Sequence, residues 1–106
     1  PQDGGRQRRM KLVLTKEAES DLIFIGDYIA QDNPRRAVSF IEELQARCTA
    51  LLDQPRAYPL VPRHEEAGIR RAVHGRYLIF YRVDPGAVVV VHILAAEMNY
   101  ERLLFP

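Results

Sequence analysis

The sequence predicts an α+β fold in which an antiparallel helical hairpin packs on a small antiparallel β-sheet, in the order β-α-α-β-β-β. Residues 77–83 and 88–95 are rich in β-branched and aromatic side chains, and they flank Asp84-Pro85-Gly86, which is typical of a tight turn. Upstream, two segments repeat apolar residues with a helical period. Because both strands are too apolar for a solvated face, the helices are expected to cover them.

The predicted fold begins with a short strand at residues 11–14, followed by a helix over residues 16–31. Thr15 is suited to cap this helix, since its hydroxyl can accept a hydrogen bond from a free backbone N–H. Glu17 and Glu19 lie in the first turn, where the helix dipole favours negative charge. One face of the helix is apolar, and it carries Ala18, Leu22, Ile25 and Ile29.

A second helix is predicted to start at Pro34 and to end before Asp53-Gln54-Pro55. Asn33 is a favourable N-cap, and the missing N–H of Pro34 costs nothing at the first helical position. The apolar face of this helix carries Ala37, Ile41, Leu44, Cys48 and Leu51, with Phe40 and Leu52 beside it. The short connection makes the two helices an antiparallel pair. Cys48 lies on the apolar face, so we interpret it as a packing residue and not as a nucleophile.

The rest of the chain is predicted to form the sheet and a tail. Residues 54–68 contain three prolines and are expected to form a rigid, largely extended crossover. Residues 69–74 form a strand, and His74-Gly75 is the simplest turn into the strand at 77–83. The tail at residues 96–106 contains several apolar side chains that must fold back on the body or meet a partner.

Length and composition favour a single domain over residues 10–106, preceded by a polar, disordered extension at residues 1–9. The extension has a net charge of +2, so a basic arm that touches nucleic acid is an alternative. The lone Cys48, the absence of a long apolar run and the lack of a visible leader point to a cytoplasmic protein without membrane contact.

Charge is distributed unevenly along the chain. Residues 63–82 carry five arginines against Glu65 and Glu66, whereas residues 10–62 carry six basic and eight acidic groups. This distribution suggests an anionic partner for the sheet side of the molecule. The alternative is that the arginines simply lie on solvated strand faces.

The sequence shows no pattern typical of a metal site or a catalytic centre. His64, His74 and His92 lack metal-ligand spacing, and His92 is better explained as a hydrogen-bonded histidine within the sheet. There is neither a nucleophile motif nor a glycine-rich phosphate loop. We therefore expect no metal, no cofactor and no catalytic residue.

Several motifs of the chain resemble the RelE/ParE superfamily of toxins from bacterial type II toxin–antitoxin systems, and the ParE branch in particular. The similarity extends from Met10 to about Leu104. It is carried by LTKEAESDLIFI at 14–25, YI at 28–29, NPRRA at 33–37, LLDQP at 51–55, IRR at 69–71 and YLIFYRV at 77–83.

The resemblance implies a partner and two alternative activities. It implies an antitoxin of the ParD type, with a ribbon-helix-helix DNA-binding half and a C-terminal segment that wraps the toxin. Operator DNA would be reached only through the antitoxin, in a complex of two toxins and two antitoxins. ParE-like members are associated with inhibition of DNA gyrase, and RelE-like members with ribosome-dependent cleavage of mRNA.

Cleavage of RNA without a metal requires a general base, a general acid and cations for the phosphate. Leu78 stands where RelE-like enzymes tend to have a strand arginine, and Glu97 places negative charge where a basic pair would be expected. We therefore favour a non-catalytic gyrase inhibitor, although Tyr100 and Arg102 leave the ribonuclease open as the alternative. A third hypothesis is a non-toxic module kept only as a ligand for the antitoxin.

Two sets of contact residues are predicted. Phe24 and Tyr28, four residues apart, and Phe40 are expected to be partly exposed and to bind the antitoxin, although all three could be interior. The predicted target-binding residues are the sheet arginines and the polar or apolar residues of the tail. They are Arg70, Arg71, Arg76, Arg82, Met98, Tyr100 and Arg102.

Overall fold

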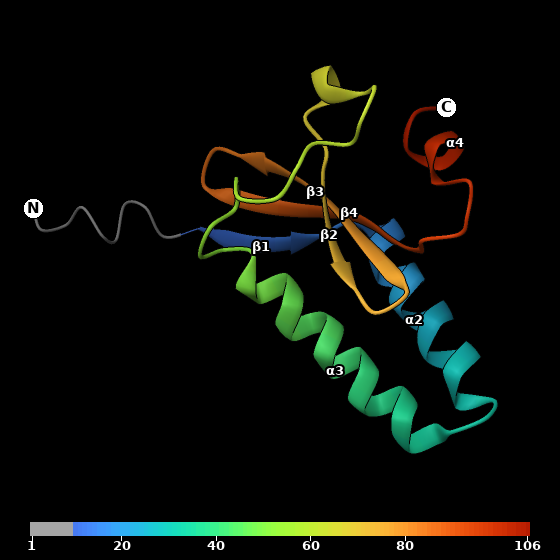
Figure 1. Ribbon diagram of the computed structural model, residues 1–106. Coiled ribbons are helices and arrows are strands. Elements are labelled where there is room, and N and C mark those ends of the chain that lie inside the picture. Colours follow the sequence, from blue (N-terminus) through green and yellow to red (C-terminus); the bar gives the residue numbers. More distant parts are fainter. Residues whose placement is uncertain (1–9) are drawn as a thin grey trace, which may run out of the picture.

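The computed structural model describes residues 10–106 and confirms the predicted α+β fold (Figure 1). The predictions for residues 1–9, a disordered extension or a basic arm, lie outside the described residues. The elements follow the predicted order, with a one-turn 3₁₀ helix and a short C-terminal helix in addition. They are β1 (Lys11–Leu14), α2 (Lys16–Ala30), α3 (Pro34–Ala50), η1 (Glu65–Ala67), β2 (Arg70–His74), β3 (Tyr77–Asp84), β4 (Ala87–Ala95) and α4 (Tyr100–Leu104).

The sheet has the strand order β1-β4-β3-β2, and it is mixed. β2, β3 and β4 are antiparallel neighbours as predicted, but β1 lies parallel to β4, with Leu14 opposite Val90. The prediction of a purely antiparallel sheet is therefore wrong for this one strand. Only strands joined by a tight turn are forced to be antiparallel, and β1 is separated from β4 by both long helices and the two other strands.

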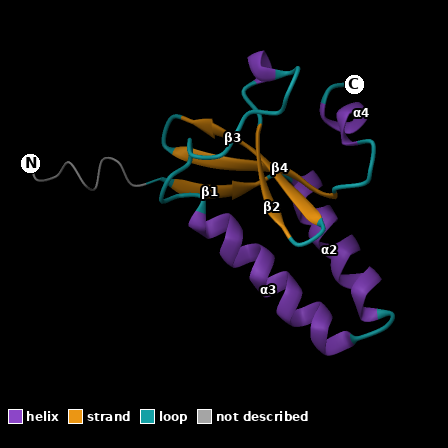
Figure 2. Cartoon of the chain, viewed as in Figure 1, coloured by secondary structure: helices purple, strands orange, loops and turns teal. Residues whose placement is uncertain are grey.

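The two long helices lie side by side on one face of the sheet, as Figure 2 shows. Both begin at the predicted caps. The Thr15 hydroxyl accepts a hydrogen bond from the Ala18 N–H at 3.1 Å, and the Asn33 side chain accepts one from the Arg36 N–H at 3.0 Å. The helices pack closely at Gly26, where a Cβ atom would lie at van der Waals distance, 3.4 Å, from the Ile41 side chain.

Both faces of the sheet are covered, because its side chains alternate between two apolar clusters. Ile79 and Tyr81 face the helices, and Leu78 and Phe80 face the other way. The helix-facing cluster also contains Leu22, Ile25, Leu44, Cys48, Val88, Val90 and Ile93. The opposite cluster contains Val61 and Leu94, against which Ile69, Val91, Tyr100, Leu104 and Phe105 pack. The tail therefore folds back on the body, which is one of the two outcomes that the sequence allowed.

The crossover at residues 54–68 is less extended than its prolines predict. Leu60 forms an isolated bridge with Arg70, and η1 adds a single helical turn that ends at Gly68, which has a φ of +74°. Val61 is buried against the second face of the sheet. In the described part of the chain, residues 10–106, no helix is both long and apolar enough to cross a membrane.

Candidate partner-binding groove

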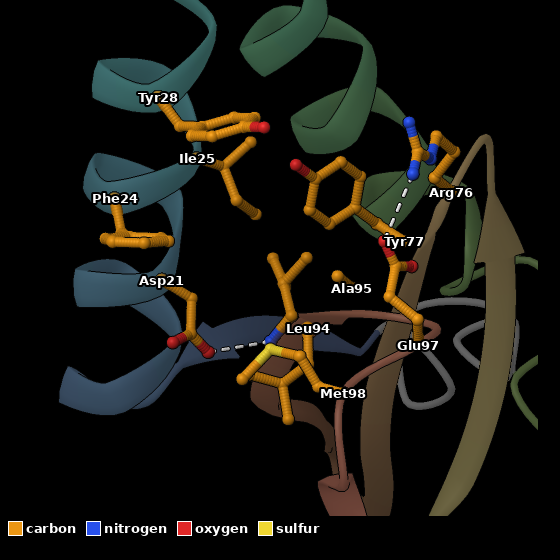
Figure 3. A pocket seen from close by; sticks show the side chains of 11 residues that line it. Asp21, Phe24, Ile25, Tyr28, Arg76, Tyr77, Leu94, Ala95, Glu97 and Met98 are labelled. Carbon is orange, nitrogen blue, oxygen red and sulfur yellow. Dashed lines mark hydrogen bonds and ion pairs between the residues drawn. The ribbon is translucent and has the colours of Figure 1, made fainter.

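An apolar groove of about 480 Å³ lies between α2 and the C-terminal end of β4 (Figure 3). We call it the α2–β4 groove. One wall comes from α2, the other comes from β4 and the segment after it, and the start of β3 closes one end. Its lining residues are Asp21, Phe24, Ile25, Tyr28, Arg76, Tyr77, Ile93, Leu94, Ala95, Glu97 and Met98.

The groove exists because β1 is shorter than β4. β1 ends opposite Val90, so the last five residues of β4 have no strand on that side. Thr15 binds the first backbone groups of β4 beyond the end of β1. Its N–H donates to Val90 O at 3.0 Å, and its hydroxyl donates to Val91 O at 2.9 Å. α2 then starts beside the edge, and its side chains face the unpaired end of β4.

Asp21, further along α2, binds the next backbone N–H on the same edge of β4. Its Oδ2 accepts the backbone N–H of Ile93 at 2.8 Å and lies 2.7 Å from Nδ1 of His92. The prediction of a hydrogen-bonded histidine within the sheet is therefore confirmed for His92. A carboxylate in this position satisfies an edge N–H that a neighbouring strand would otherwise bind.

Two of the three aromatic residues predicted to bind the antitoxin line the groove and are exposed. Phe24 is 72% and Tyr28 62% exposed, one turn apart on α2, and Met98 is also exposed on the groove lining. Exposed apolar side chains that cluster in a concave site are typical of a surface that binds a partner.

The expected exposure of Phe40 is wrong, because this side chain is only 8% exposed. Its ring lies against the β2–β3 hairpin, 5.4 Å from the ring of His74 and 5.6 Å from that of Tyr77. Phe40 follows Ala37 by three residues and precedes Leu44 by four, so it lies on the buried face itself and not beside it.

The rim of the groove carries charges of both signs, on side chains that are themselves paired. Arg76 Nη2 and Glu97 Oε2 form an ion pair of 3.1 Å between two exposed side chains. Burial raises the pKa of the neighbouring Tyr77 phenol above its ordinary value, and Tyr28 and Glu97 add to the shift while Arg76 opposes it. Tyr77 therefore remains a neutral hydrogen-bonding group at physiological pH.

The predicted target-binding arginines do not form one patch. Arg70 Nη1 donates to Tyr58 O at 2.7 Å, so it ties the crossover loop to β2. Arg82 Nε lies 3.1 Å from both carboxylate oxygens of Asp84. Arg76 lies at the groove, whereas Arg71 belongs to the second face of the sheet.

The structure also divides the predicted tail residues between these two surfaces. Met98 joins Arg76 in the groove, whereas the Tyr100 hydroxyl accepts a hydrogen bond from Arg71 Nη1 at 2.7 Å on the opposite face. The Tyr100 ring lies 4.9 Å from that of Phe80, and Arg102 is exposed on α4. The residues predicted to form one target-binding surface therefore lie on two separate surfaces of the molecule.

Each of the three histidines lies next to one carboxylate. His64 Nε2 lies 3.2 Å from Glu101, with the ring stacked on Phe105 at 4.0 Å, and His74 Nε2 lies 3.1 Å from Glu43. Across residues 10–106, no group of three or more histidine, cysteine, aspartate or glutamate side chains is arranged to hold a metal ion.

Sequence reasoning missed several groove residues, including Asp21, Tyr77 and Ala95. Asp21 carries a weak signal, because it precedes Phe24 and Ile25 by three and four residues on α2 and so borders both of its apolar stripes. Its partners are more than 70 residues away, and no local pattern identifies them.

A comparison with family models identifies one family, and two solved structures share the fold. The family model described as "ParE toxin of type II toxin-antitoxin system, parDE" matches residues 12–100. Among solved structures, the chromosomal ParDE toxin–antitoxin system of P. aeruginosa is similar, with a TM-score of 0.71, 22% identity and coverage of 85% of this chain and 99% of that one. The RelBE2 toxin–antitoxin complex of Mycobacterium tuberculosis has a TM-score of 0.54, 24% identity and coverage of 82% and 98%. No curated protein matches the sequence.

Proposed function

The chain belongs to the ParE toxin family of type II toxin–antitoxin systems, and we propose that it inhibits DNA gyrase by protein–protein binding and is neutralised by a ParD-type antitoxin. Such a toxin acts in the cytoplasm, where gyrase and its DNA are found. It needs a surface for the antitoxin and a surface for the target.

The observation that carries the antitoxin half of the proposal is the α2–β4 groove. Phe24 and Tyr28 remain largely exposed on a chain of only 106 residues, although the rest of α2 contributes Leu22 and Ile25 to the core. Covering two aromatic rings and Met98 in a preformed groove supplies the buried apolar contact that dominates protein interfaces. The similar solved structures are of a ParDE system and of a RelBE complex, which supports an antitoxin as the partner.

Three arrangements support action by binding and not by catalysis. Arg82 and Arg76 already lie against carboxylates, and Arg70 is bound to backbone carbonyl oxygens. Each histidine likewise has one acidic neighbour on a separate part of the surface. A general base, a general acid and phosphate-binding cations would have to converge on one substrate, and these groups are spread over the molecule.

For the target, we propose the remaining basic and tail residues, with Arg71, Arg82 and Arg102 as the charged contacts. Operator DNA is bound only through the antitoxin, whose ribbon-helix-helix halves pair. Two toxins and two antitoxins then form the smallest complete complex. Light scattering of the purified complex tests this stoichiometry, and a mass equal to one copy of each protein would contradict it.

Two assays test the proposed function. Expression of the chain alone is expected to arrest growth, and co-expression of the antitoxin is expected to restore it. Purified chain at micromolar concentration is expected to inhibit supercoiling by gyrase. Growth arrest with unaffected gyrase would rule out this target, and unaffected growth would favour the non-toxic ligand of an antitoxin.

The alternative function, a ribosome-dependent endoribonuclease of the RelE type, rests on one observation. Arg71 and Tyr100 meet at 2.7 Å on the second face of the sheet, so a cation and a phenol are available together. Primer extension on translated mRNA after induction tests this alternative. Cuts inside codons that disappear in Tyr100→Phe would favour the nuclease, and their absence would reject it.

A further inference from the structure

Three arginines gather around Tyr58, where the C-terminal end of α3, the crossover loop and β2 meet. Arg47 comes from α3, Arg56 from the loop and Arg70 from the start of β2. Arg47 Nη1 donates to the Tyr58 hydroxyl at 2.8 Å, and its Cζ lies 5.1 Å from the centre of that ring. Arg70 Nη1 donates to the backbone carbonyl of Tyr58 at 2.7 Å and to that of Arg56 at 3.3 Å. We call these four residues the Tyr58 cluster.

The Tyr58 cluster has no negative charge to balance its arginines. Arg47 and Arg70 are half-buried, and every acceptor that they reach within residues 10–106 is a neutral oxygen. Over the same residues no carboxylate forms an ion pair with any of the three arginines, whereas other arginines of the chain do have such partners. Charged side chains that are drawn out of water are normally paired, so an anion from outside the chain is the missing component.

The segments that build the cluster are poor in acidic residues. Residues 44–60 and 69–74 contain a single one, Asp53, which is exposed. The neighbouring Tyr81 senses the excess of positive charge. Burial raises the pKa of its phenol, and the charges of Arg70 and Arg47 both oppose that shift. The two guanidinium groups therefore act on the same region of the molecule.

The hydrogen bonds within the chain hold the arginines without using all their donors. A guanidinium group carries five N–H donors in a fixed fork. In the described part of the chain, Arg47 uses Nη1 and Nη2 once each, and Arg70 uses only Nη1. The remaining N–H groups can donate to an anion. Because the two side chains are already held, less conformational entropy is lost when the anion binds.

We propose that the Tyr58 cluster binds phosphate groups of a nucleic-acid backbone, and that in the inhibited complex this backbone is the DNA on which gyrase acts. This inference rests on the proposed function, which brings the chain to an enzyme that holds DNA. Arginine matches phosphate well, since its planar fork donates two parallel hydrogen bonds to the phosphate oxygens. Contacts to phosphate carry no sequence information, so the recognition of operator DNA stays with the antitoxin.

The surroundings of the cluster favour a phosphate backbone over an acidic peptide. A nucleic-acid strand repeats its charge at every nucleotide, so it offers several anions to arginines that come from three different elements. A peptide interface would add apolar anchors. None of the exposed large apolar side chains of residues 10–106 belongs to residues 44–60. Val73 is exposed on β2, but it pairs with Leu78 and shares that residue's face of the sheet, opposite to the face of Arg70.

Fluorescence anisotropy of a labelled DNA duplex of arbitrary sequence, with the full chain as the binding protein, tests the site. Arg56→Gln is the informative variant, because within residues 10–106 its side chain forms no hydrogen bond or ion pair that holds the fold. The variant is expected to weaken binding about threefold and to lower the slope of the logarithm of affinity against the logarithm of salt concentration by about one.

Arg35→Gln is the matched control. It removes the same charge from an exposed position on the first turn of α3, which lies about 18 Å along the helix from Arg47 and so beyond the screening length at about 0.1 M salt. Its affinity and salt slope are expected to equal those of the unchanged chain. Arg6, Arg8 and Arg9 are the same in both variants, so the comparison isolates the cluster. Equal losses in the two variants would contradict the site.

A nuclear magnetic resonance titration of the unchanged chain gives an independent result that needs no substitution. The arginine Nε signals of ¹⁵N-labelled chain are followed while the duplex, and separately inorganic phosphate, is added. The signals of Arg47, Arg56 and Arg70 are expected to shift with both, and that of Arg35 is expected to stay in place. Shifts confined to other arginines would contradict the proposal.

Two competitors separate the DNA backbone from other anions. A polyglutamate peptide of the same charge is expected to bind more weakly than the duplex at equal ionic strength. Tighter binding of the peptide would assign the cluster to an acidic protein segment and overturn the proposal. A single-stranded RNA that displaces the duplex at lower concentration would retain the phosphate site but overturn its assignment to the DNA of gyrase.

Gyrase supercoiling assays distinguish failure of this inference from failure of the function beneath it. Arg56→Gln is expected to inhibit supercoiling less strongly than Arg35→Gln does. Equal inhibition by the two variants would overturn the contact with gyrase's DNA and leave the proposed function in place. A chain that binds DNA through the cluster but leaves supercoiling unaffected would overturn the proposed function, and the phosphate site would stand without it.

Discussion

Asp21 holds the free end of β4 against α2 through two hydrogen bonds. Replacement by alanine leaves the Ile93 N–H and His92 Nδ1 without their acceptor in a half-buried position. Asp21→Ala is therefore expected to lower the free energy of unfolding by about 1–3 kcal/mol, measured by urea denaturation. Asp27→Ala, on an exposed turn of the same helix, is the control and is expected to change it by less than about 0.5 kcal/mol. Equal losses of unfolding free energy in the two variants would contradict the role of Asp21 as the hydrogen-bond acceptor for the end of β4.

Cys48 is expected to be inert in the folded chain. Burial raises the pKa of its thiol from 9.0 to about 11, and the charge of Arg47 opposes this shift only in part. At pH 8 a thiol reagent is expected to react slowly with the native protein and rapidly with the protein in urea, since the thiolate is the reactive form. A native reaction as fast as the unfolded one would contradict this burial.

The same shift has a consequence for stability above neutral pH. A proton is bound more tightly by the folded thiol than by the unfolded one, so this contribution is complete below pH 9 and is lost as the pH rises from 9 to about 11. The free energy of unfolding is expected to fall in this range, and to fall less in Cys48→Ala. Parallel profiles for the two proteins would contradict the assignment.

Glu43 is expected to titrate below its ordinary value of 4.5. A hydrogen bond from Arg36 is the largest cause of the lowered pKa, and one from His74 adds to it. Because the folded pKa is depressed, the stabilisation is present above pH 4.5 and is lost as the pH falls through the folded pKa. Carbon-detected titration of the Glu43 carboxyl tests this, and Arg36→Ala is expected to raise the pKa more than His74→Gln does. The reverse order would contradict it.

Single residues could be predicted from the sequence where their role is local. The caps Thr15 and Asn33 were predicted correctly, because a cap depends on residues three positions away. The burial of Phe40 was not predicted, because this residue lies at the edge of the apolar face of its helix. Its exposure depends on the β2–β3 hairpin, which packs against the ring. For His92 the kind of contact could be predicted but not its partner, Asp21, which is 71 residues away.

Among the elements, α4 was not predicted as a helix, because the sequence indicated only an apolar tail that folds back or meets a partner. Its contacts allow a test of why it docks. Tyr100→Phe removes only the hydrogen bond with Arg71 and is expected to cost about 1 kcal/mol of unfolding free energy. Tyr100→Ala also removes the ring from Phe80 and is expected to cost about 2–4 kcal/mol. Thermal or urea unfolding measures both, and small, equal losses would show that α4 does not stabilise the second face.

The two long helices and the four strands could be predicted to within a few residues, because their apolar periods are clear and their ends carry caps, prolines and glycines. The single turn of η1 could not, and neither could the parallel pairing of β1. A strand of four residues that is followed in sequence by two helices carries no signal for its partner or direction. The parallel pairing of β1 covers only the first half of β4 and leaves the second half without a neighbouring strand on that side. The groove therefore depends on a strand pairing that the sequence does not show.

For the molecule as a whole, the sequence predicted the family and part of each surface, but not their separation. Phe24, Tyr28, Arg76 and Met98 were identified, and the fold brings these four residues to one groove. The basic region at residues 63–82 suggested an anionic partner for the sheet side, yet strand alternation sends Arg70 toward the crossover loop and Arg71 to the opposite face. Net charge along a chain does not show which face of a sheet each charge occupies.

The central claim is that the α2–β4 groove binds the antitoxin through Phe24 and Tyr28, and calorimetric titration of the antitoxin into the double variant Phe24→Ala/Tyr28→Ala tests it most directly. The matched control is Ile23→Ala/Val38→Ala, which removes two similarly exposed apolar side chains outside the groove. We expect the groove variant to raise the dissociation constant at least about a hundredfold, and the control to change it by less than about threefold. A groove variant that binds as tightly as the control would contradict the claim.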